Sequence, residues 1–139
     1  DFNLLSPFDD LAYENGKIST IIKATNSSVI NDYKINNNIM AFNDLNYDLK
    51  IYYKGKVYET ENNRVTNYAC GHNIVAFMDE YKNTFNVFYD GTFKIVSKEI
   101  IKEYIVINDM VAYIDANDNF YIFYEYNDND LYNEDLRIM

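Results

Sequence analysis

Short apolar runs alternate with polar turn residues along most of this 139-residue chain. The clearest example is the stretch 68–96, in which four strand-like runs are separated by turn residues at 72–73, 79–83 and 90–91. The runs are rich in the aromatic and β-branched residues that favour strands. The Asn, His, Asp and Gly residues between them suit tight turns, several of which require a positive φ. The pattern predicts one small antiparallel sheet of four strands.

The same pattern occurs three times. The copies open at Tyr33, Tyr68 and Tyr104, at spacings of 35 and 36 residues. Further columns agree between the copies: Ala41-Phe42, Ala76-Phe77 and Ala112-Tyr113; Asp44, Asp79 and Asp115; and Ile51-Tyr52-Tyr53, Val87-Phe88-Tyr89 and Ile122-Phe123-Tyr124. Self-similarity at a fixed period is the signature of a repeat architecture. The chain is therefore predicted to consist of stacked sheets of one type.

These columns resemble the blades of β-propeller proteins, in the general style of the WD40-like and TolB-like repeats of bacteria. The resemblance covers about residues 8–126 and rests on the period and the strand pattern, since the chain has no Trp and hence no Trp-Asp dipeptide. It implies an all-β fold: a β-propeller or partial propeller of three to four four-stranded antiparallel blades. It also implies a binding platform, because propellers host many unrelated functions.

We predict one propeller-like domain over residues 1–139. A partial blade is expected at about 8–30, three blades are expected at about 33–60, 68–96 and 104–126, and a tail covers 127–139. The tail is expected either to return as a strand through Leu131, Leu136 and Ile138 or to fray. Since closed propellers have roughly four to eight blades, this count favours part of a larger propeller or assembly.

Composition narrows the classes of function. The net charge of −10, with a pI near 4.4, argues against nucleic-acid binding, because no basic stripe is present to meet phosphates. The single cysteine excludes an internal disulfide. No apolar run approaches the ~20 residues needed for direct membrane insertion. The start at Asp1 and the abundance of Asn, Ile, Lys and Tyr lead us to expect an exported bacterial protein, in the periplasm or at the cell surface.

Asp44, Asp79 and Asp115 form the most prominent polar column. Each follows the second strand of its copy, so either the side chains cap their own loops as Asx turns or they form an acidic rim for cations or basic groups. His72 occupies a turn column, and Cys70 lies in the column of apolar residues that includes Val106. A lone His and a lone Cys make neither a usual zinc site nor a nucleophile–base pair. No catalytic residue, metal or cofactor is predicted.

The sequence therefore favours a non-catalytic, protein-binding scaffold module, within a larger bacterial envelope or surface assembly. Its expected partners are proteins or further blades. One alternative is a glycan-binding module that uses tyrosines with Asp or Asn hydrogen bonds. Another is a fragment of a propeller enzyme that acts on glycans.

Overall fold

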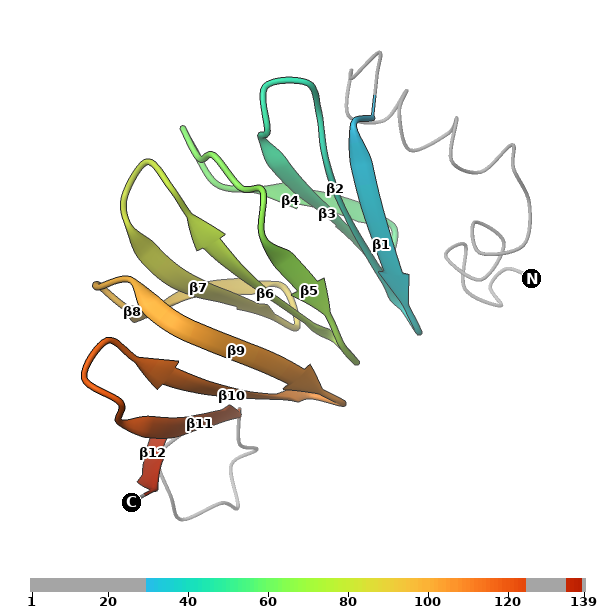
Figure 1. Ribbon diagram of the computed structural model, residues 1–139. Coiled ribbons are helices and arrows are strands. Elements are labelled where there is room, and N and C mark those ends of the chain that lie inside the picture. The colour runs from blue at the N-terminus through green and yellow to red at the C-terminus, as the bar shows by residue number, and fades with distance from the viewer. Residues whose placement is uncertain (1–29, 125–134, 139) are drawn as a thin grey trace.

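The computed structural model describes residues 30–124 and 135–138. These residues form three four-stranded sheets, which lie side by side in chain order like the slats of a fan (Figure 1). Sheet 1 comprises β1 (Asp32–Asn36), β2 (Ile39–Asn43), β3 (Leu49–Tyr53) and β4 (Lys56–Glu59). Sheet 2 comprises β5 (Tyr68–Cys70), β6 (Ile74–Asp79), β7 (Thr84–Tyr89) and β8 (Thr92–Ser97). Sheet 3 comprises β9 (Ile101–Ile107), β10 (Met110–Asp115), β11 (Phe120–Tyr124) and β12 (Asp135–Ile138).

Within each sheet, strands that are consecutive along the chain pair antiparallel. The all-β prediction with four-stranded blades is confirmed. In the tail, Leu136 and Ile138 lie on β12. The predicted partial blade at about 8–30 lies, apart from Ile30, outside the described residues.

Tight turns join the strands where the sequence predicts them. Between the third and fourth strands, Lys54 and Gly55 have φ of 49° and 80°, and Asp90 and Gly91 have φ of 47° and 92°. Positive φ at both central residues matches the right-handed twist of the flanking strands. Between the first and second strands, a positive φ occurs at Asn37, Asn73 and Asn108. In sheet 2 it thus falls on Asn73, whereas His72 keeps a negative φ.

Successive strand residues point to opposite sides, so each sheet has two faces, and apolar residues occur on both. We call the side toward the preceding sheet the leading face, and the side toward the following sheet the trailing face. The leading face of sheet 2 carries Tyr68, Val75, Phe77 and Phe88, which pack in one core with Ile39, Ala41, Leu49, Ile51 and Tyr53 of sheet 1. Its trailing face carries Ile74, Ala76, Phe85 and Val87, which pack in a second core with Val111, Tyr113 and Phe123 of sheet 3. The cores therefore lie between sheets.

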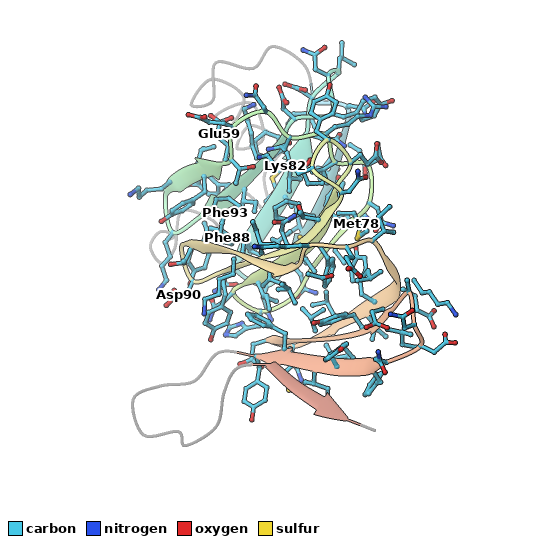
Figure 2. The ribbon with its side chains drawn as sticks, turned by 90° about the vertical axis from the view of Figure 1, so that its left-hand side faces the viewer. Glu59, Met78, Lys82, Phe88, Asp90 and Phe93 are labelled. Carbon is cyan, nitrogen blue, oxygen red and sulfur yellow. The ribbon has the colours of Figure 1, made fainter. Side chains whose placement is uncertain are left out.

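Aromatic rings fill the core between sheets 1 and 2. Phe88 is fully buried, and its ring centroid lies 5.8 Å from that of Tyr53, 5.0 Å from Tyr58 and 5.0 Å from Phe93. Phe88 and Phe93 are seen side by side in Figure 2. Tilted and edge-on pairs at these separations add about 0.5–1.5 kcal/mol to the burial of their apolar area. This cluster fixes how sheet 2 sits on sheet 1.

The linker 60–67 joins sheets 1 and 2 and is hydrogen-bonded to both. The Val65 amide donates to the Tyr47 carbonyl at 2.9 Å, and the Val65 carbonyl accepts from Asn43 Nδ2 at 2.9 Å. On the other side, the Glu80 amide donates to the Arg64 carbonyl at 2.8 Å. The linker therefore ties the loop after β2 to the loop after β6.

Candidate binding surfaces of the sheet array

A tyrosine hydroxyl links the first strand of sheet 2 to sheet 1, and another links the first strand of sheet 3 to the residue that precedes β5. Tyr68 Oη donates to Asp32 Oδ2 at 2.8 Å, and Tyr104 Oη donates to Asn67 Oδ1 at 2.6 Å. Each acceptor directly precedes the position at which the preceding sheet carries its own first-column tyrosine. The third residue in this acceptor column is Glu103. A hydrogen-bond position is thus repeated along the array.

These hydroxyls remain protonated donors at neutral pH. Burial raises the pKa of Tyr68, and the hydrogen bond to Asp32 raises it further. Burial likewise raises the pKa of Tyr104. The shared cause is that burial disfavours the charged phenolate.

The turns after the first strands also connect the sheets. The His72 amide donates to the Asn108 carbonyl at 2.7 Å, and the Asn73 amide donates to Asn38 Oδ1 at 3.2 Å. Gly71 of sheet 2 lies against the turn after β9 of sheet 3. A Cβ at this position would lie 2.2 Å from the Asn108 carbonyl oxygen. Only a residue without a side chain fits at this place.

The trailing face of sheet 3 has the pattern of a buried interface but is open to solvent. Ile105, Ile107, Met110 and Phe120 have exposed fractions of 56%, 52%, 37% and 36%. The residues that correspond to Met110 in the other sheets, Ile39 and Ile74, are fully buried. The register places Ile105 beside Ala112 and Ile107 beside Met110, so the exposed groups form one surface. We call it the open face.

A hollow of about 250 Å³ lies on the open face, lined in part by Glu103, Ile105, Ile114 and Phe120. Its apolar walls carry a carboxylate at the place where the other sheets present the acceptor for a tyrosine. At the opposite end of the array, Tyr33 and Ile35 are also exposed, at 48% and 37%. The two ends of the array thus differ in chemistry.

The aspartate column caps its own loops. Asp44 Oδ1 accepts from the amides of Asn46 and Asp48 at 2.8 and 3.1 Å. Asp115 Oδ1 accepts from the amides of Asn117 and Asn119, both at 2.9 Å. These contacts lower the pKa of Asp115, the bond from the Asn119 amide contributing most.

Asp79 makes the equivalent bond and is also buried. Its Oδ1 accepts from the Tyr81 amide at 3.0 Å and from the linker amide of Arg64 at 3.4 Å, and its Oδ2 lies 3.6 Å from Lys82 Nζ. The three carboxylates are therefore engaged in loop structure, and the acidic rim stays a prediction. Among residues 30–124, no group of three or more His, Cys, Asp or Glu side chains is placed to hold a metal ion.

Replacing Asp79 by asparagine is expected to change the free energy of unfolding by less than about 1 kcal/mol, because the amide oxygen still accepts both backbone bonds. Asp79→Ala should cost about 1–3 kcal/mol, because it leaves two partly buried amides unpaired. Urea unfolding of the two variants measures the difference. A large loss in Asp79→Asn would show that the charge itself is needed.

Cys70 and His72 differ in burial. Cys70 is half-buried against the core between sheets 1 and 2, and burial raises the pKa of its thiol to about 12. His72 is exposed in the turn. The interpretation of Cys70 as a small apolar residue agrees with this placement.

A second hollow, of about 360 Å³, lies between the first strands of sheets 2 and 3. Its lining mixes the aromatic and apolar residues Tyr68, Met78, Ile101 and Tyr104 with Asn67 and Glu103. The described part of the chain contains no helix long and apolar enough to cross a membrane.

The four-stranded sheets pack face to face in chain order, with hydrogen bonds between neighbouring sheets at their first strands, and so define a β-propeller array. A model of the 10-bladed beta propeller domain family matches residues 10–135, so the chain belongs to that family. A comparison with curated proteins gave no match.

One solved structure agrees on the fold at a TM-score above 0.5, and two others are similar with lower scores. The N-terminal domain of Nup159 is similar with a TM-score of 0.51 at 11% identity, over 80% of this chain and 30% of that one. The computationally designed Ika8 protein gives 0.44 at 18% identity, over 68% and 32%. Kluyveromyces lactis Hsv2 gives 0.40 at 16% identity, over 78% and 37%. The chain thus spans about a third of the length of each of these proteins.

Proposed function

We propose that the chain is a non-catalytic, protein-binding module of a larger propeller assembly, and that the open face of sheet 3 is its docking surface. The observation that supports this most is the contrast between equivalent columns. In the column of Met110, Ile39 and Ile74 are fully buried by the next sheet, whereas Met110 is 37% exposed. In the column of Phe120, Leu49 and Phe85 are likewise buried, whereas Phe120 is 36% exposed. Contiguous exposed apolar surface of this kind marks interaction sites.

Adding one blade to the chain tests this proposal. A copy of residues 60–97, which carries the linker and sheet 2, is appended after Met139. In sheet 1, the fourth strand ends at Glu59 and the linker then leads to Tyr68. Since β12 ends at Ile138, the appended copy would present its leading face to the open face and its tyrosine to Glu103.

We expect the extended chain to unfold at a higher temperature than the original chain, with slower amide exchange at Ile105 and Ile107. The matched control carries the same extension with serine at the copied positions of Phe77 and Phe88, which removes the leading-face apolar groups. Equal melting temperatures and unprotected amides in both extended chains would overturn the proposal.

The proposal also includes the propeller subtype and the cellular location. The WD40-like or TolB-like style rests on the blade pattern alone, and the bacterial envelope rests on composition. Fractionating the cells that produce the chain tests the location, and recovery of the protein only from the cytosol would contradict it.

Glycan binding is the alternative function, and the hollow between β5 and β9 favours it. Tyr104 supplies aromatic surface there, while Asn67 and Glu103 supply polar groups. A glycan array probed with the chain and with Tyr104→Ala tests it. Binding that is lost in the variant would support this alternative, and the absence of any binding would remove it. A glycan-cleaving enzyme would in addition need turnover that depends on named carboxylates.

A further inference from the structure

We infer that the open face of sheet 3 binds a second copy of this chain, through Tyr33 and Ile35 of that copy's first strand. The inference rests on the proposed docking role of the open face and names its occupant. The tyrosine hydrogen bond between neighbouring sheets occurs twice in the array, and we call it the joint. In both instances a first-strand tyrosine donates to the residue that precedes the first-column position of the neighbouring sheet.

Both halves of a third joint are present in the chain. Tyr33 belongs to the column of Tyr68 and Tyr104, and Glu103 belongs to the column of Asp32 and Asn67. Within residues 30–124, neither the hydroxyl of Tyr33 nor the carboxylate of Glu103 takes part in a hydrogen bond. Both side chains are exposed. A donor at one end of the array and an acceptor at the other are therefore both available to a neighbouring copy.

The apolar groups beside them are also complementary. On the trailing side of the first strand, sheet 1 has the polar pair Lys34 and Asn36, which bond to carbonyls of sheet 2. Sheet 3 has Ile105 and Ile107 at these positions. Such a surface suits an apolar strand face, and Ile35 is the apolar neighbour of Tyr33 on the leading face of β1.

The area available for contact between copies is limited by the part of sheet 1 that is already buried. Met40 and Phe42, on the leading face of sheet 1, have exposed fractions of 0% and 1%. The contact between copies is therefore confined to the first strands and their turns, and small interfaces of this kind are weak. Each copy also carries a net charge of −10, so repulsion opposes contact at low salt. Association should increase with protein concentration and with ionic strength.

We call the exposed β1 surface of sheet 1 the head and the open face of sheet 3 the tail. The interface is heterologous, because one copy contributes its head and the next copy its tail. Such contacts build chains or rings. Two variants that each lose one half can therefore complement one another. The head variant is Tyr33→Asp, which places a like charge against Glu103 of the neighbour. The tail variant is Ile105→Asp, which charges the open face. Tyr81→Asp, at an exposed loop residue of sheet 2, is the control.

Sedimentation velocity and native mass spectrometry are run on the full chain and the variants, with circular dichroism to verify the fold. We expect the wild type and Tyr81→Asp to form multimers in steps of 16.5 kDa as concentration increases. The head and tail variants should each remain monomeric when alone. Their equimolar mixture should form a one-to-one heterodimer and nothing larger.

Three results would overturn the inference: a monomeric wild type at all concentrations and salt levels, self-association of Tyr33→Asp at the wild-type level, or a mixture without heterodimer. The second result would instead show a symmetric contact through sheet 3. The appended-blade experiment separates the two proposals. If the added blade stabilises the chain while copies do not associate, the docking role stands and the second copy is excluded.

Discussion

Replacing Gly71 by alanine should destabilise the protein by about 3 kcal/mol, since overpacking a close contact costs about 1–3 kcal/mol and occasionally more. The new Cβ would lie 2.2 Å from the Asn108 carbonyl oxygen, 2.6 Å from Val106 Cγ1 and 2.8 Å from Ile74 Cγ2. Two of these atoms belong to sheet 3, and the carbonyl oxygen also accepts the bond from the His72 amide. Relief requires sheets 2 and 3 to move apart, which opens the core between them.

Gly55→Ala is the matched control. Gly55 has a φ of +80°, but nothing lies within 4 Å of a Cβ built there. Its substitution should cost only the strain of the left-handed conformation, about 1–2 kcal/mol. Urea unfolding of both variants at constant m-value measures the two changes. Equal losses in the two variants would show that the inter-sheet contact at Gly71 adds nothing.

Replacing Phe88 by alanine should cost about 3–5 kcal/mol, the range for a buried phenylalanine. Its ring contacts Tyr53 and Tyr58 of sheet 1 and Phe93 of sheet 2, so the change leaves a cavity at the centre of the first core. Since the rings belong to two sheets, the cavity cannot close by moving one strand. The expected result is a large fall in the free energy of unfolding.

Phe120→Ala is the comparison, because it removes the same ring from the open face. Phe120 is 36% exposed, so the expected loss is below about 1 kcal/mol. Thermal and urea unfolding at low protein concentration keep self-association out of the measurement. A similar loss for both phenylalanines would mean that the open face is covered in solution.

The sequence predicted the sheets because their determinants are local. The Asp90-Gly91 pair and its counterparts fix the turns, and the aromatic runs fix the strands that follow. The interpretation of Asp44, Asp79 and Asp115 as loop caps likewise depends only on amides two to four residues away. Such contacts are visible in a short window of sequence.

The contacts between sheets could not be predicted in this way. Tyr68 and Asp32 are 36 residues apart, so their pairing becomes visible only when the copies are superposed. The superposition does show a usable signal, since an acceptor precedes each first-column tyrosine. Glu103 could have been found from this column. The exposure of Ile105 could not, because strand alternation alone does not tell which sheet lacks a neighbour.

His72 illustrates a finer limit. Its column suggested a positive φ, but the structure gives that conformation to Asn73. The His72 amide donates to the Asn108 carbonyl of sheet 3 at 2.7 Å. This turn is therefore held in part by a contact with the neighbouring sheet, which the local sequence does not show.

The linker 60–67 bonds to loops on both of its neighbours. In the described residues, one hydrophobic core joins sheet 2 to sheet 1 and another joins sheet 2 to sheet 3. In arrays of this type, stability is the sum of terms for each unit and each pair of neighbours. Sheet 2 takes part in two pair terms, and each outer sheet takes part in one among the sheets described. Opening should therefore start at the ends and proceed inward, and the middle sheet should be the last to exchange its amides.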